Sequence, residues 1–256
     1  MAVHPSLPDL VDLLAVREGI VCVVGAGGKK SLIYALVRGH GGRVAMTATA
    51  HTTEFPADLP VERIVDEESA LRERIANSPR ERSIAYACPS GKPGRLAGVS
   101  ADTIRAIHEQ GGFAATFVKA DGARMRRVKA PAEDEPLIVP GAATVVPVVS
   151  ITAVGEPLTE RVAHRVERVE AATGLARGAT ITPEALGRLL ASGQGALQGT
   201  EGMRVAPVIN MVDNARHEEL ARATATAALA MTSRFDRVFL CSLRQGSESL
   251  VSVVTR

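Results

Sequence analysis

Aromatic residues are scarce in this chain: they make up 3% of its 256 residues, and tryptophan is absent. Proteins that grip nucleic acid usually combine clustered lysines and arginines with aromatic platforms on which bases stack. The formal net charge of +2 gives no strongly basic balance either. We therefore expect no nucleic-acid partner.

Cysteines are few, and long apolar runs are missing. The three cysteines, Cys22, Cys88 and Cys241, are widely separated in apolar stretches, which argues against a disulfide framework and against a CxxC metal site. No segment approaches the roughly 18 consecutive apolar residues that span a bilayer, and the N-terminus lacks a basic region followed by a long apolar core. These absences predict a cytoplasmic protein with no membrane partner.

What is present is the composition of an ordinary globular protein, with 46% apolar and 23% charged residues. The length suits one large α/β domain with a substantial core. We expect a single domain over residues 1–256, in which residues 155–202 are a candidate helical insertion.

Apolar runs alternate with helical patterns along the chain. The expected strands cover residues 20–24, 43–49, 83–87, 113–120, 144–150, 205–212, 237–240 and 250–254. The expected helices cover residues 6–16, 31–38, 67–76, 101–109 and 218–231, with two more inside 160–191. The second of those two follows Thr182, whose hydroxyl suits the N-cap position before Pro183. This alternation predicts an α/β fold with a mostly parallel sheet and helices on both faces.

The most informative segment is VVGAGGKKS, in which an apolar strand ends in glycines and a helix follows. Backbone N–H groups in such a turn point inward, the helix N-terminus adds partial positive charge, and a lysine on the first turn can reach outer phosphates. The segment therefore predicts a phosphate-binding turn, called the glycine turn below. Its residues are Gly25, Ala26, Gly27, Gly28, Lys29, Lys30 and Ser31.

Two positions depart from the P-loop pattern G-x-x-x-x-G-K-[ST]. Val23 stands where the first glycine belongs, and Lys30 replaces the Ser or Thr whose hydroxyl normally ligates magnesium. An ammonium group has no lone pair to donate to a metal, and Ser31 comes one residue late. A plain strand-to-helix turn with solvated lysines remains open as an alternative. A dinucleotide-binding turn is the nearest competitor, but it would need glycine at position 30 and an acidic residue where Thr47 to Thr49 stand.

Four motifs occur in a recognisable order: GAGGKKS at 25–31, TATAH at 47–51, KADGAR at 119–124 and KAPAEDEP at 129–136. Together they resemble the YqeC-like family of accessory proteins for selenium-dependent molybdenum hydroxylases. The resemblance implies a P-loop NTPase-like three-layer sandwich that binds ATP or GTP with Mg²⁺. It also implies a role in maturation of the selenium/molybdenum cofactor, with a molybdenum hydroxylase or a cofactor-maturation protein as partner.

The same resemblance assigns roles to individual residues. Lys29 matches the phosphate-binding lysine, His51 a catalytic position, and Asp121 the acidic strand end that organises magnesium, with Ser31 as the other candidate metal ligand. Thr47 and Thr49 match the threonines expected to contact substrate. Three positions disagree with the family pattern: Lys30 stands for Thr, Lys119 for Glu and Met211 for Lys.

Two further groups of residues are candidates for ligand contacts. Asn210 and Asp213 follow a strand in the position of a guanine-reading N-K-x-D segment, and Ser242 follows the next strand. A strand-end turn with a helix cap made by Asp213 or Asn214 is the alternative. Arg124, Arg126, Arg127 and Lys129 form a basic loop after Asp121, suited to an anionic substrate or a partner's carboxylate. A solvated surface loop explains this last group equally well.

Two functions follow from these residues. The first is an NTPase or NTP-dependent transferase in which Lys29 binds phosphate and Asp121 organises magnesium. The second is a non-hydrolysing nucleotide- or anion-binding module, in which Lys30 and Lys119 neutralise charge in place of a metal. Lys30 is the residue that discriminates between them.

Overall fold

The computed structural model describes residues 7–244 and 249–256. The larger strands are β1 (Gly19–Gly25), β2 (Val44–Ala48), β4 (Glu62–Val65), β5 (Ile84–Ala87), β7 (Ala115–Lys119), β9 (Thr144–Ser150), β12 (Val208–Asn210), β13 (Arg237–Ser242) and β14 (Ser249–Thr255). The two-residue strands are β3 (Thr52–Thr53), β6 (Arg95–Leu96), β8 (Val128–Lys129), β10 (Ala163–His164) and β11 (Arg204–Val205). The helices are α1 (Leu7–Leu13), α2 (Lys29–Gly39), α3 (Glu68–Ala76), α4 (Ala101–Gly111), α5 (Val166–Thr173), α6 (Pro183–Ala191) and α7 (Ala215–Met231), with a 3₁₀ turn η1 (Ile151–Ala153).

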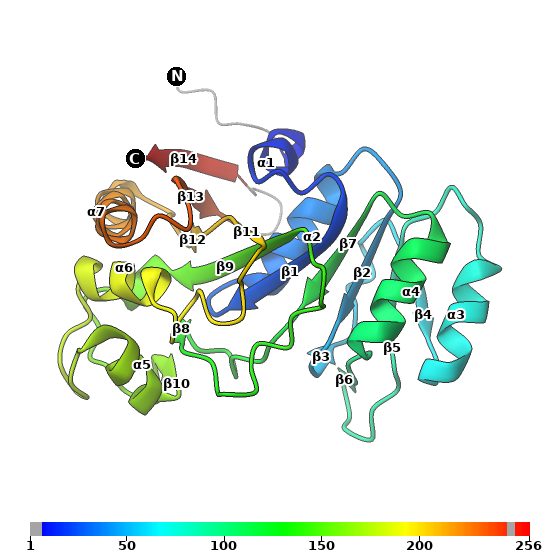
Figure 1. Ribbon diagram of the computed structural model, residues 1–256, viewed down its shortest axis with the longest axis horizontal. Helices are drawn as coiled ribbons and strands as arrows, with labels where there is room; N and C mark the ends of the chain where they lie inside the picture. The colour runs from blue at the N-terminus through cyan, green and yellow to red at the C-terminus, as the bar shows by residue number, and fades with distance from the viewer. Residues whose placement is uncertain (1–6, 245–248) are drawn as a thin grey trace.

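A mostly parallel central sheet organises the molecule (Figure 1). Its strand order is β14-β13-β12-β9-β1-β7-β2-β5-β4, with β11 paired to β9 off this path. Only β14 pairs antiparallel among these strands, at one edge against β13. The chain leaves β1 towards β2 on one side and later crosses from β7 to β9 on the other. The order therefore reverses around β1, the place in open α/β sheets where ligands bind.

Side-chain alternation along the strands assigns the helices to the two faces of this sheet. In β1, Val21 and Val23 pack in a core with α1 and α2, whereas Ile20 and Cys22 pack in a core with α3 and α4. Strand β9 follows the same alternation and contributes Val149 to a third core, with α5, α6 and α7. One face is thus covered by α1 and α2, and the other by two groups of helices side by side.

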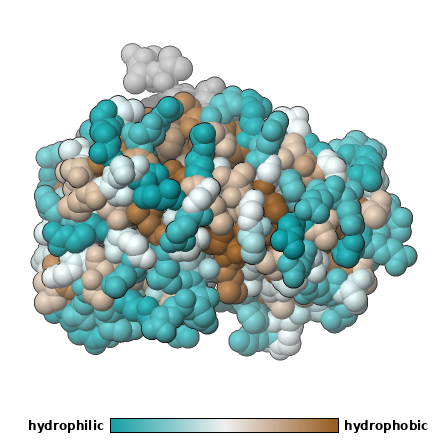
Figure 2. Space-filling model, in the orientation of Figure 1, coloured by the Kyte–Doolittle hydropathy of each residue, from teal (hydrophilic) through white to brown (hydrophobic). Residues whose placement is uncertain are grey.

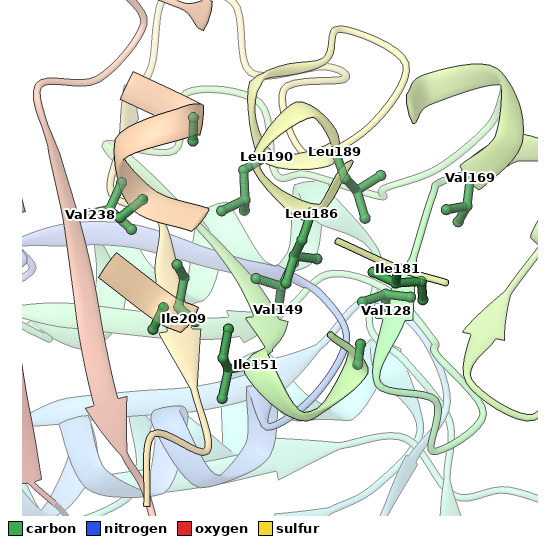
Figure 3. Close-up of a cluster of buried hydrophobic side chains, with 14 of the residues drawn as sticks. Val128, Val149, Ile151, Val169, Ile181, Leu186, Leu189, Leu190, Ile209 and Val238 are labelled. Atoms are coloured by element: carbon green, nitrogen blue, oxygen red, sulfur yellow. The ribbon is translucent and has the colours of Figure 1, made fainter. Parts of the chain in front are cut away.

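The third core contains side chains from the segment between η1 and β11 and from strands β9, β12 and β13 of the sheet. Leu186 of α6 lies next to Val149 of the sheet, and Leu189 of α6, Ile209 of β12 and Val238 of β13 belong to the same cluster (Figure 3). Figure 2 shows hydrophobic atoms mainly near the middle of one face, surrounded by hydrophilic ones. The region expected as an insertion therefore shares its buried side chains with α7 and β13.

The α/β class and the parallel sheet covered by helices on both faces are confirmed. Every expected strand and helix is found, although residue 6 of the first expected helix lies outside the described residues. The expected strand 205–212 is interrupted at Ala206 and Pro207, because proline has no N–H for the ladder, and it becomes β11 and β12. None of the helices among the described residues combines the length and apolar character needed to cross a membrane.

Candidate anion-binding site

The carboxyl ends of neighbouring parallel strands bring the predicted residues to one edge of the sheet. Strand β1 ends at Gly25, β7 is followed by Asp121, and β2 is followed by Thr49. On the other side of β1, β9 ends at Ser150 and β12 at Asn210. In Figure 1 the arrowheads of β9 and β1 point to the left and lower left.

The glycine turn has the backbone geometry that only glycine adopts readily. Gly25, Gly27 and Gly28 have φ values of +92°, +85° and +130°. A Cβ atom on Gly28 would lie 2.0 Å from the side-chain nitrogen of Asn210, and one on Gly27 would lie 2.7 Å from the backbone nitrogen of Ser150. The close approach of neighbouring elements therefore requires glycine here, in addition to the turn.

The first N–H groups of this turn are hydrogen-bonded within the protein, whereas those that follow are unpaired among the described residues. The N–H groups of Gly25 and Ala26 donate to Asp121 Oδ2 and to the carbonyl of Val148, both at 2.9 Å. For residues 27–31, no acceptor is found within the described part of the chain. Helix α2 begins at Lys29 with Gly28 as N-cap, so these amides sit at the positive end of the helix dipole. Unpaired amides at a helix N-terminus are features that favour an anion, so the turn is a candidate anion site.

Asp121 lies at the centre of the site and is buried, with 2% of its surface exposed. Its Oδ1 lies 2.8 Å from Lys29 Nζ, and its Oδ2 lies 3.0 Å from Lys129 Nζ. Both lysines are buried as well. The ammonium of Lys29 also donates a hydrogen bond to the carbonyl of Gly25, while Asp121 Oδ1 is met by its charge without an aligned hydrogen bond. Burial lowers the pKa of Lys29, and Asp121 opposes that shift by stabilising the ammonium.

Two residues of this network, Glu135 and Arg165, were not predicted as site residues. Lys129 pairs with Glu135 as well as Asp121, and Arg165 pairs with both oxygens of Glu135 at 2.8 and 3.0 Å. Burial raises the pKa of Glu135, but hydrogen bonds from Arg165 and Lys129 outweigh it and lower the pKa to about 2. The sequence signal was the acid-rich segment of KAPAEDEP, which lies near Arg165 only in the folded chain.

The donor atoms around Asp121 do not fit a magnesium ion. Asp121 Oδ2 is already taken by the Gly25 amide and by Lys129, and Oδ1 faces the ammonium of Lys29. Lys30 occupies the position of the usual hydroxyl ligand. Within the described residues, no cluster of three or more His, Cys, Asp or Glu side chains is placed to hold a metal. A divalent cation here would lie among ammonium groups, which repel it.

Asn210 connects the candidate base-binding segment to the glycine turn. It is buried, its Nδ2 donates to the carbonyl of Gly27 at 2.9 Å, and its Oδ1 accepts from the backbone N–H of Leu243 at 3.2 Å. The side chain therefore braces the turn against the end of β13. Met211, in the left-handed backbone region with φ +65°, accepts a hydrogen bond from Ser150 Oγ on its sulfur.

Asp213 lies beside Asn210 but makes different contacts. Its carboxylate accepts from Ser242 Oγ at 2.6 Å and pairs with Arg244 at 2.9 Å. Asn214, which follows it, caps α7 by accepting from the N–H of His217. The structure thus brings Asp213 and Ser242 together, and the helix cap is supplied by Asn214.

The threonines expected to contact substrate use their hydroxyls inside the protein. Thr47 is buried and donates to the carbonyl of Tyr86 at 2.7 Å, and Thr49 donates to the carbonyl of Leu137 at 2.9 Å. The His51 side chain is exposed, and its carbonyl accepts a hydrogen bond from Lys119 Nζ. These hydrogen bonds tie the segment to β5, to Leu137 and to the end of β7.

The basic loop after Asp121 divides into two parts. Arg124 and Met125 adopt left-handed backbone with φ +46° and +61°, and both are exposed. Arg127 instead folds back to the carbonyl of Thr152 and to Glu156, at 3.0 and 2.8 Å. Arg124 is therefore available to a ligand or partner, whereas Arg127 and Lys129 hold the loop in place.

The charges around the turn are strongly unbalanced. Lys29, Lys30, Lys119, Lys129 and Arg165 contribute five cations, against the carboxylates of Asp121 and Glu135. Burial and the neighbouring lysines together lower the pKa of Lys119 to about 8, although the charge of Asp121 opposes this shift. Excess positive charge at a helix N-terminus favours anions. Fold and site together define an α/β protein with a strand, glycine turn and helix arranged as in P-loop NTPases.

Comparison with known proteins identifies the family. The family model described as YqeC protein matches residues 21–167, more than half of the chain, so this protein belongs to the YqeC family. A protein of Escherichia coli (strain K12) named "Uncharacterized protein YqeC" is 29% identical to it over 198 residues, which cover 76% of each chain. The matched region contains the glycine turn, Lys119, Asp121, Lys129, Glu135 and Arg165.

Proposed function

We propose that the protein binds the phosphate groups of a nucleoside triphosphate, ATP or GTP, on the glycine turn. The observation that carries this proposal is the set of free backbone amides at residues 27–31, beside the buried lysine Lys29. Anions bind at helix N-termini because such amides and the helix dipole both favour negative charge. A cavity of about 20 Å³ beside Asp121 has room for one water molecule, so the phosphates would lie on the solvent side of the turn.

Lys29 supplies the mobile charge in this proposal. In the structure its ammonium is held by Asp121 and by the carbonyl of Gly25. When phosphates occupy the turn, the same ammonium can move to them, because Asp121 keeps Lys129 as a counter-ion. The geometry favours the binding module over the NTPase, since Asp121 has no oxygen left for a metal without displacing a lysine.

The biological role proposed here is that of an accessory protein in maturation of the selenium/molybdenum cofactor of molybdenum hydroxylases. Its support is the resemblance carried by ADGAR and KAPAEDEPLIVP. Base choice is proposed to lie with Asp213, whose carboxylate can accept from the amino and imino groups of guanine once Arg244 moves aside. Both nucleotides therefore belong in the test.

We expect wild-type protein to bind ATP or GTP with nearly the same affinity in magnesium and in a chelator, a change of about threefold or less. Lys29→Ala should weaken binding at least about 100-fold, because it removes charge-assisted hydrogen bonds to the phosphates. Calorimetric titration measures both effects. The matched control is Lys92→Ala, which removes an exposed lysine far along the chain from the turn.

Two results would contradict the proposal. One is failure of both nucleotides to bind at millimolar concentration, and the other is unchanged affinity in Lys29→Ala. Phosphate release measured in the same samples distinguishes the NTPase, which requires Lys29-dependent turnover with magnesium. Lys30→Thr restores the usual hydroxyl, and it should produce magnesium-dependent binding if Lys30 is what replaces the metal.

A further inference from the structure

Lys30 and Lys119, two of the three residues that depart from the family pattern, reach the same short segment. Lys30 extends from the first turn of α2, and its Nζ donates to Thr53 Oγ1 at 2.9 Å. Lys119 extends from the end of β7, and its Nζ donates to the carbonyl of His51, also at 2.9 Å. Both acceptors are neutral. Two cations thus converge on residues 51–53, and among the described residues neither has a carboxylate within ion-pair distance, whereas Lys29 and Lys129 do.

A third cation lies next to them. Arg95 is exposed on β6, directly opposite Thr53 in the β3–β6 pair. Burial lowers the pKa of Lys30, and the charge of Arg95 lowers it further. Across the described residues, no carboxylate forms an ion pair with Lys30, Lys119 or Arg95. Like charges held this close destabilise the protein unless an anion joins them.

We propose that Lys30, Lys119 and Arg95, with the hydroxyl of Thr53, form a second anion site that takes a small, doubly charged oxyanion as co-substrate. This inference rests on the proposed function, in which the glycine turn and Lys29 hold the nucleotide. The two sites use different atoms: backbone amides serve the nucleotide, whereas the side chains of Lys30 and Lys119 point to the β3–β6 pair. Because the two proposed sites share Lys30, an oxyanion bound at the second site would lie near the terminal phosphate of the nucleotide.

The direct test is calorimetric titration of inorganic phosphate into protein saturated with a non-hydrolysable triphosphate analogue. We expect one further phosphate to bind to the analogue-saturated protein, and Lys30→Gln and Lys119→Gln each to weaken that phosphate binding about tenfold when they too are saturated with the analogue. Arg237→Gln, which removes an exposed arginine at the start of β13, is the control and should change neither the phosphate affinity nor the analogue affinity. The inference is overturned if phosphate fails to bind, displaces the analogue, or binds the two variants as it binds wild type.

Failure of this inference can be told apart from failure of the proposed function. Lys29→Gln weakens the nucleotide site but leaves its backbone amides, so in nucleotide-free Lys29→Gln the second site is reported by the part of sulfate binding that depends on Lys30 and Lys119. Retained sulfate binding that is lost on adding Lys119→Gln supports the second site, even if nucleotides do not bind. Sulfate binding that is insensitive to Lys30 and Lys119 overturns it. Thermal unfolding of each variant, followed by circular dichroism, confirms that the variant is folded.

A pH series gives an independent measure. Lys119 faces Lys29 and Lys30 from α2, Lys129 from β8, and Asp121, and its pKa of about 8 means that its charge is lost above that pH. Sulfate keeps its charge across this range. Its affinity should therefore fall between about pH 7 and 9 in wild type, while Lys119→Gln shows a flatter profile. Equal pH profiles in the two proteins would contradict a role for Lys119.

Discussion

Replacement of Asp121 by asparagine should lower the free energy of unfolding by about 3–5 kcal/mol, the usual cost of removing one partner from a buried ion pair. Asp121 is the shared counter-ion of Lys29 and Lys129, and all three side chains are buried. An amide in its place leaves two ammonium groups close together in a region of low dielectric. The two lysines would relieve part of this cost by losing protons, and this deprotonation limits how far the free energy of unfolding can fall.

Urea denaturation of wild type and Asp121→Asn measures this loss. The matched control is Asp134→Asn, which neutralises an exposed aspartate in the following segment and should change stability by about 0.5 kcal/mol or less. A loss in Asp121→Asn as small as that of the control would show that the buried lysines do not depend on this carboxylate. The charge network described above would then be incorrect.

Gly25→Ala should destabilise the protein by a similar amount, about 2–5 kcal/mol. Left-handed backbone costs a residue with a Cβ about 1–2 kcal/mol, and forced overpacking adds about 1–3 kcal/mol. Gly25 has φ +92°, and its new Cβ would lie 2.4 Å from the carbonyl oxygen of Val148 in the adjacent central strand. That oxygen cannot move without disturbing β9.

The control for this substitution is Gly41→Ala, because Gly41 has ordinary φ and nothing within 4 Å of its added Cβ. Thermal and urea unfolding should leave Gly41→Ala close to wild type. If Gly25→Ala were equally stable, the turn could not have the close-packed backbone that the structure shows.

Local patterns in the sequence predicted the main helices and strands because each of these elements has its own recognisable pattern of apolar and turn-forming residues. The apolar run at β1 followed by glycines gave the strand and the turn, and Thr182 was expected to cap α6, where its side chain accepts from the N–H of Ala185. Strand β4 was missed because it is a charged edge strand in which only Ile64 is buried. The two-residue strands are defined by their partners, which no local pattern reveals.

The candidate site also has features that the sequence predicted and features that it did not. The places of the glycine turn and of Asp121 could be predicted from strand ends, whereas the partners of individual side chains could not. Lys129 was expected to meet a substrate, yet it is buried on Asp121 and Glu135. The hydroxyl of Thr47 bonds to Tyr86 in the neighbouring strand β5. Such contacts depend on which strands become neighbours, so they become visible only in the folded chain.

The central claim, that the amides at the start of α2 hold phosphate, is tested most directly by amide chemical shifts of isotope-labelled protein titrated with a triphosphate. We expect the largest changes at residues 27–31, whose N–H groups are free, and smaller ones at Ala26, whose N–H is already bonded to Val148. A nucleotide that binds while the shifts of residues 27–31 stay constant would contradict the account.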